Sequence, residues 1–192
     1  MAIQGEIDSL FIHKGALKVI EEAEAKKIMR DHDVQALPSK VVFTLKPDPK
    51  DPRGKKKCRI VACGNFAKEE ENQDLFTSGA DSTSLRLVLC EAAQRGWEGA
   101  NLDVRAAFLN APMKRVDEDS EDGMELKKAL LRPAQVLVNL GYFRHNEYWE
   151  VLKALYGFRE SPRLWSDHRD GVMRKMAVLN SYLAQMESEP AV

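Results

Sequence analysis

The stretch "LPSKVVFTLKPDPKDPRGKKKCRIVACGNF", residues 37–66, decides how the chain begins to fold. Two segments rich in β-branched and apolar residues, 40–46 and 57–63, flank a tip of Pro, Asp, Gly and Lys. That composition favours two strands joined by a turn. We therefore predict a long β-hairpin over this stretch.

The predicted hairpin is strongly basic. Between residues 40 and 59, eight basic residues are opposed by two aspartates, a balance of +6, although the whole 192-residue chain has a net charge of −1. Acidic stretches follow at 68–74 and 117–125. A basic stripe between acidic loops is typical of a surface that handles phosphates. The alternative is a solvated loop with a run of lysines.

The composition is that of an ordinary globular protein, with 44% apolar and 31% charged residues. No apolar run approaches the ~18 residues of a membrane span, and the first ten residues have no secretory pattern. Three cysteines, Cys58, Cys63 and Cys90, lack zinc spacing. We therefore expect an intracellular protein with reduced thiols and no membrane segment.

Three helices are predicted from periodicity and capping residues. Residues 15–30 have an apolar face, and 83–95 have apolar residues at helical spacing, with Thr83 as N-cap and Gly96 ending the helix. A third helix is expected to start near Pro162, with Ser161 as its cap. Residues 114–130 are acidic and read as a loop or insertion, and 132–142 and 147–158 are mixed apolar segments.

Asp103 is a carboxylate among apolar neighbours. We predict a short strand over 98–105, with Asp103 pointing away from its apolar face. A buried charge costs several kcal/mol unless it is paired or holds a metal. Asp103 is therefore a candidate metal ligand, and the alternative is a strand-end Asp that caps the next turn.

Four blocks in register then carry a family resemblance. They are "KVVFTLKP…KKKCRIVACGNF", "TSLRLVLCEAAQRGW", "LDVRAAFLNA" and "ALYGFRESPRLW". In order and spacing they resemble the reverse transcriptases of copia-type retrotransposons. The resemblance implies an α+β fold, a right-hand polymerase with fingers and an incomplete palm. It places a fingers-like region at 1–97 and a partial palm at 98–192, without the family's Tyr-x-Asp-Asp hairpin.

The resemblance also implies an activity and its partners. The family consists of RNA-directed DNA polymerases that use two Mg²⁺ ions. Its substrates are an RNA or DNA primer–template and deoxynucleoside triphosphates. Its members normally lie in a polyprotein beside protease, integrase and RNase H.

The resemblance gives roles to individual residues. Asp103 matches the first catalytic, metal-binding aspartate, and Phe108 matches an aromatic ring that excludes a 2′-OH. Arg59 matches the fingers arginine that grips the triphosphate, as Arg can hold phosphate oxygens bidentately. Further nucleotide-binding candidates are Lys57, Ala106, Ala107, Tyr156 and Gly157, and nucleic-acid candidates are Lys55, Lys56, Ser161 and Pro162. From the residues alone, two alternatives remain open. Phe108 could be a residue of the core, and residues 157–161 could form the turn before a helix without binding a ligand.

The sequence contains no Asp-Asp pair. The resemblance implies that this pair supplies the second metal-binding carboxylate, so we expect the 192-residue chain to be inactive in DNA synthesis by itself. The alternative function is a non-enzymatic retrotransposon remnant that binds nucleic acid or other chains. A cellular protein that reuses the fold is a third possibility.

Overall fold

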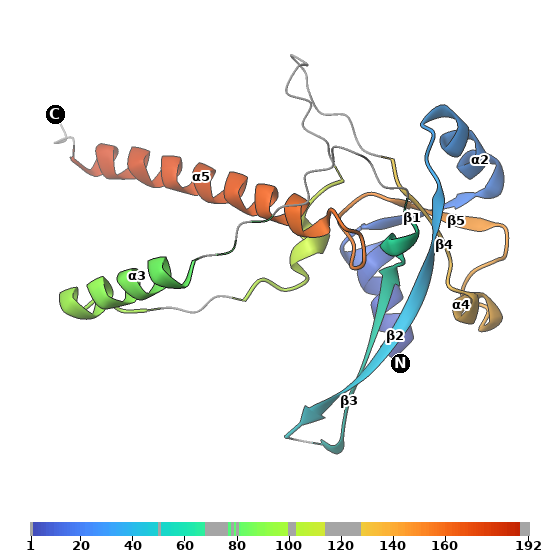
Figure 1. Ribbon diagram of the computed structural model, residues 1–192, viewed down its shortest axis with the longest axis horizontal. Helices are drawn as coiled ribbons and strands as arrows, with labels where there is room; N and C mark the ends of the chain where they lie inside the picture. The colour runs from blue at the N-terminus through green and yellow to red at the C-terminus, as the bar shows by residue number, and fades with distance from the viewer. Residues whose placement is uncertain are drawn as a thin grey trace.

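The structure is a computed structural model that describes residues 2–49, 51–67, 77, 79, 81–99, 103–113 and 128–188 (Figure 1). It combines helices with one five-stranded sheet in the order β1-β5-β4-β2-β3. The strands are β1 (Leu17–Glu21), β2 (Ala36–Asp48), β3 (Asp51–Ala62), β4 (Leu130–Arg132) and β5 (Glu147–Val151). The described helices are α1 (Ala2–Ile7), the π-helix η1 (Asp8–His13), α2 (Glu22–Asp31), the 3-10 helix η2 (Gly64–Phe66), α3 (Ser82–Arg95), the 3-10 helix η3 (Ala107–Asn110), α4 (Gln135–Asn139) and α5 (Ser161–Ser188). Strands β1, β2 and β3 come from residues 1–97, and strands β4 and β5 come from residues 98–192.

The predicted hairpin is confirmed and is longer than expected. β2 and β3 pair antiparallel from Ser39↔Ala62 to Lys46↔Lys55, with an irregularity before Asp48↔Asp51. Only the base of β2 joins the rest of the sheet, through parallel pairing of Ala36–Pro38 with β4. The outer half of the hairpin therefore projects from the body of the molecule (Figure 1).

The predicted helix over 15–30 is wrong in its first seven residues. Residues Leu17–Glu21 form β1, which pairs antiparallel with β5 in the register Leu17↔Val151. Leu17 and Ile20 are buried there, and the helix begins only at Glu22. Pairing and burial in a sheet outweigh the weak local preference for a helix.

The main core lies around Trp149 of β5, which is fully buried. Phe11 and Phe143 approach its ring with centroid distances of 5.3 and 4.8 Å, both in edge-on geometry. Leu10, Leu131 and Leu155 are also fully buried in this cluster. The core fixes β5 and the segment after it, which carries Tyr156 to the base of the hairpin.

The helix predicted at 83–95 is confirmed as α3, but its N-cap is Asp81 rather than Thr83. The Asp81 carboxylate accepts hydrogen bonds from the backbone N–H groups of Thr83 and Ser84, at 3.0 and 3.1 Å. Gly96 ends the helix with φ +64, as predicted. No residue of α3 is buried, and its apolar side chains Leu85, Leu87, Val88 and Leu89 are exposed on the described part of the chain.

The strand predicted at 98–105 is wrong for the residues that the structure describes. Glu98, Gly99, Asp103 and Val104 have no strand pairing, and Arg105 begins a turn. A strand needs a partner to satisfy its backbone groups, and no strand of the described chain lies beside these residues. Residues 100–102, and 114–127 of the predicted loop, lie outside the described residues.

The predicted helix near Pro162 is confirmed as α5, which extends away from the sheet (Figure 1). Ser161 is its first residue and is fully buried. Its hydroxyl donates to the carbonyl of Leu155 at 2.6 Å, so it ties the helix to the preceding turn instead of capping it. Across the described residues, no helix has the length and apolarity that a membrane span requires.

Candidate functional site

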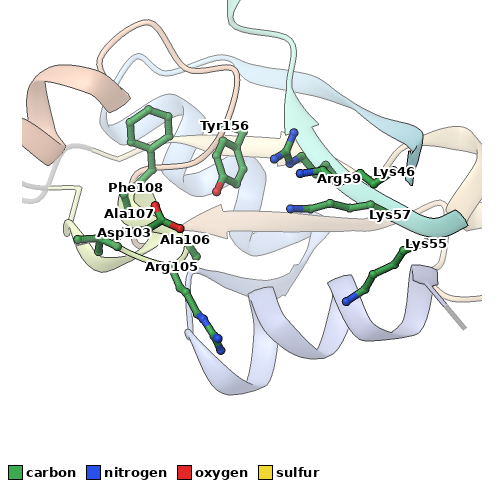
Figure 2. Close-up of a pocket in the computed structure, with 11 residues that line it drawn as sticks. Lys46, Lys55, Lys57, Arg59, Asp103, Arg105, Ala106, Ala107, Phe108 and Tyr156 are labelled. Carbon is green, nitrogen blue, oxygen red and sulfur yellow. The ribbon is translucent and has the colours of Figure 1, made fainter. Parts of the chain in front are cut away.

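A pocket of about 650 Å³ lies between the hairpin and the turn that follows Asp103. Figure 2 shows Lys57 and Arg59 reaching from β3 toward Tyr156, with Phe108 and Asp103 on the far side. The described residues lining it are Lys46, Lys55, Lys57, Arg59, Asp103, Val104, Arg105, Ala106, Ala107, Phe108 and Tyr156. Three chain segments that are far apart in sequence therefore meet at one cavity.

The hairpin supplies the cationic wall. Lys55, Lys57 and Arg59 alternate along β3, so they share one face. Lys46 lies directly across from Lys55 on β2, and like charges in that position are destabilising. Lys56 falls on the opposite face and does not line the pocket. Because four cations crowd one face, an anion bound there would relieve their repulsion.

The opposite wall is a tight turn that places Asp103 and Phe108. Ala106 has φ +51, a left-handed conformation that costs a non-glycine residue about 1–2 kcal/mol. Its carbonyl accepts a hydrogen bond from the Leu109 N–H at 2.9 Å. The Asn110 amide also reaches the Ala106 carbonyl, at 3.4 Å, and is itself held by the Lys14 ammonium at 2.9 Å. Strain maintained in this way is common at functional sites.

Tyr156 connects the two walls. Its ring lies 5.4 Å from that of Phe108, and the Arg59 guanidinium lies 5.5 Å from its centroid. A cation over an aromatic face is attracted by about 0.5–1 kcal/mol at exposed sites. Tyr156 therefore orients Arg59 toward the side of the pocket that carries Phe108.

Gly157 fixes Tyr156 against the base of β3. The Ala62 N–H donates to the Tyr156 carbonyl at 2.8 Å, and the Gly64 N–H donates to the Gly157 carbonyl at 3.2 Å. Gly157 has φ +95, and a Cβ there would overlap the Ala62 carbonyl oxygen. The close approach that glycine allows at this position is therefore to the chain's own backbone at Ala62.

The pocket unites most of the predicted site residues. Eight of them line it, namely Lys55, Lys57, Arg59, Asp103, Ala106, Ala107, Phe108 and Tyr156. Lys56, Gly157, Ser161 and Pro162 are not among the lining residues. Because the Ser161 side chain is buried and hydrogen-bonded within the protein, it supports α5 rather than facing a ligand.

Sequence reasoning missed two charged residues of the lining, Lys46 and Arg105. Lys46 could have been found from the hairpin register, since it faces Lys55. Arg105 lines the pocket, and in Figure 2 its side chain points away from Tyr156. It contributes charge at the edge of the pocket.

Asp103 is exposed, so the prediction that its charge is buried among apolar neighbours is wrong. It is the one carboxylate among the described residues that line the pocket. Across the described chain, no group of three or more His, Cys, Asp or Glu side chains is placed to hold a metal. Mg²⁺ is commonly bound by one or two carboxylates together with substrate phosphates. The oxygen donors of Asp103, opposite a wall suited to phosphates, fit one ligand of such an ion.

Comparison with known proteins gives one family. The model of the family "Reverse transcriptase (RNA-dependent DNA polymerase)" matches residues 24–185. The chain is similar to the retrovirus-related Pol polyprotein from transposon TNT 1-94 of Nicotiana tabacum, with 28% identity over 195 residues covering 100% of this chain. It is also similar to the retrovirus-related Pol polyprotein from transposon RE1 of Arabidopsis thaliana, with 30% identity over 125 residues, or 65% of this chain.

The chain spans 12% of the length of the first polyprotein and 8% of the second. No solved structure matches it. The family match covers the hairpin, the turn after Asp103 and the Tyr156 segment, which together form the pocket. The chain therefore belongs to the reverse transcriptase (RNA-dependent DNA polymerase) family, and its relatives are retrovirus-related Pol polyproteins of transposons.

Proposed function

We propose that the pocket binds a deoxynucleoside triphosphate for RNA-directed DNA synthesis. The observation that carries this proposal is the meeting of Lys57 and Arg59 with Asp103 and Phe108 around one cavity. A cationic wall opposite a carboxylate and an aromatic ring matches the three parts of the ligand. These parts are its phosphates, its metal ion and its sugar.

The hairpin holds the phosphates. Arg59 offers a planar guanidinium for two phosphate oxygens, and Tyr156 orients it. Lys57 adds a point charge from the same strand face, and Lys46 and Lys55 extend the positive wall toward the hairpin tip. These four cations neutralise a polyanion that the rest of the near-neutral chain would not attract.

The turn after Asp103 holds the other end of the nucleotide. Asp103 would hold Mg²⁺ together with the triphosphate oxygens, and the ion would stabilise charge on the transferred phosphoryl group. Ala106 and Ala107 have small side chains, which let the triphosphate approach their backbone N–H groups. Phe108 is half-buried beside Tyr156, where its ring would limit the space at the 2′ position of the sugar.

The remaining partners are proposed from the family. The fingers-like region 1–97 and the partial palm 98–192 would together contact a primer–template, with Lys56 and Pro162 on the nucleic-acid side and Gly157 on the nucleotide side. Protease, integrase and RNase H would be the neighbours in a polyprotein. Nucleic-acid contacts of this kind are mostly to phosphates and carry little sequence preference.

The proposal is tested by calorimetric titration of the chain with dCTP and Mg²⁺. Arg59→Ala should weaken binding roughly 10- to 100-fold, because a charged hydrogen-bonded contact contributes about 1.5–3 kcal/mol. Arg53→Ala is the matched control, since Arg53 lies at the hairpin tip with its side chain 88% exposed. Equal affinities of the two variants would refute the proposal.

A second candidate function is association with another chain, which the exposed apolar face of α3 favours. Leu85 and Leu89 lie one helical turn apart and are 54% and 60% exposed. Contiguous exposed apolar surface marks interaction sites in soluble proteins. Analytical ultracentrifugation tests whether copies of this chain associate with one another, and a chain that stays monomeric at all concentrations would rule out such self-association.

A further inference from the structure

Glu6 of α1 contacts the strand that carries the cations of the pocket. Its carboxylate Oε1 accepts a hydrogen bond from the backbone N–H of Ile60 at 3.2 Å. Ile60 directly follows Arg59 in β3, the last strand of the sheet, against which α1 packs. The Glu6 carboxylate therefore lies at the outer edge of β3, next to the residues of the cationic wall.

The charge of Glu6 acts on two of those cations. Burial raises the pKa of Glu6 above its ordinary value, while the Ile60 hydrogen bond and the charges of Lys57 and Arg59 act in the opposite direction. The pKa of the Cys58 thiol is raised by burial and by the charge of Glu6. On the neighbouring η1, the Asp8 carboxylate accepts a hydrogen bond from Gln4, and His13 lies at its far end.

No ion pair within 4.0 Å joins Glu6 to Lys57 or Arg59 in the described chain, so the interaction acts through space. Such a charge offsets the mutual repulsion of the cations when the pocket holds no anion. When a triphosphate enters, the same negative charge opposes it. Because the pKa of Glu6 is raised on balance, the cost of burying its charge outweighs this attraction in the free protein. The charge is therefore expected to show in ligand affinity and not as a gain in stability.

We propose that Glu6 is the internal counter-charge of the cationic wall and sets the affinity of the pocket for a triphosphate. The inference rests on the proposed function and deepens it by naming a positioning residue that acts through Lys57 and Arg59. Glu6 precedes residues 24–185, which match the family model, so the match assigns it no role.

The test compares Glu6→Gln with the wild-type chain by titration with dCTP and Mg²⁺ at several pH values. Glutamine keeps an oxygen that accepts the Ile60 hydrogen bond and removes only the charge. At pH 8 the variant should bind dCTP roughly two- to fivefold more tightly. The ratio of the two dissociation constants should approach one as the pH falls through the raised pKa of Glu6, because the wild-type carboxyl is then neutral too.

Glu147→Gln is the matched control. The Glu147 carboxylate also accepts a hydrogen bond from a backbone N–H, that of Arg144 at 2.8 Å, and it does not line the pocket. The control variant removes the same charge as Glu6→Gln. Because Glu147 does not line the pocket, the control should bind dCTP like the wild type. Because folding raises the Glu6 pKa, ionisation at pH 8 opposes folding, and Glu6→Gln should unfold at no lower urea concentration than the wild type.

The outcomes separate the two proposals. If Arg59→Ala weakens dCTP binding but Glu6→Gln binds like Glu147→Gln, the inference about Glu6 alone is wrong. Weaker binding by Glu6→Gln would also overturn it, since the carboxylate would then act mainly as an anchor for β3. If Arg59→Ala binds like the wild type, the proposed function fails and the role of Glu6 fails with it.

Discussion

Replacing Gly157 with alanine should separate Tyr156 from the base of the hairpin. A Cβ at this position would overlap the Ala62 carbonyl oxygen and lie 2.9 Å from its carbon. The obstructing atoms are backbone, so no side-chain rotation can relieve the overlap. Either β3 or the Tyr156–Gly157 turn must move.

The cost has two parts. A left-handed conformation costs a residue with a Cβ about 1–2 kcal/mol. Separation of the segments would also weaken the hydrogen bonds from Ala62 and Gly64, at about 1 kcal/mol each. Gly157→Ala should therefore lower the free energy of unfolding by about 3–4 kcal/mol.

Gly141→Ala provides the matched control. Gly141 has φ +77, and a Cβ there would have no neighbour within 4 Å. Its replacement should cost only the strain of about 1–2 kcal/mol. Urea unfolding followed by circular dichroism measures both variants. Equal costs would refute the reasoning, because they would show that the backbone approach at Gly157 does not constrain the fold.

Three further outcomes follow from exposed or pocket-lining groups. Phe108→Val should reduce the ratio of the affinities for dCTP and CTP, whereas Phe66→Val, at an exposed position, should leave that ratio unchanged. An unchanged ratio in both variants would show that Phe108 does not select the sugar. Binding of an RNA–DNA hybrid should weaken steeply with salt, as phosphate contacts do, and a flat salt response would exclude the hairpin stripe as the contact. The double variant Leu85→Ser and Leu89→Ser should self-associate less in ultracentrifugation, and unchanged association would place the interface elsewhere.

The hairpin and α3 could be predicted because their signals are local. Two segments rich in β-branched and apolar residues and a tip of Pro, Asp, Gly and Lys predict the hairpin, and helical spacing with Gly96 predicts α3. β1 could not, because its residues also fit a helical period and become a strand only by pairing with β5. The strand predicted over 98–105 is wrong at its described residues for the converse reason, since alternation predicts a strand but does not supply its partner.

The pocket was predictable as far as the motifs reached. Asp103, Phe108, Arg59 and Lys57 were candidates from sequence, and the fold brings them together. Lys46 depended on the register between the two strands. Glu6 could not be predicted, because only packing of α1 on β3 brings it to Ile60. Contacts made by tertiary packing leave no local pattern in the sequence.

The most direct test of the triphosphate pocket compares two adjacent lysines of β3. Lys57 lines the pocket and Lys56 lies on the opposite strand face, so the variants Lys57→Ala and Lys56→Ala remove equal charge from neighbouring positions. Titration with dCTP and Mg²⁺ at fixed salt should show binding weakened roughly tenfold by Lys57→Ala. Lys56→Ala should bind like the wild type. Equal weakening by both, or by neither, would contradict a pocket that binds the triphosphate through one face of the hairpin.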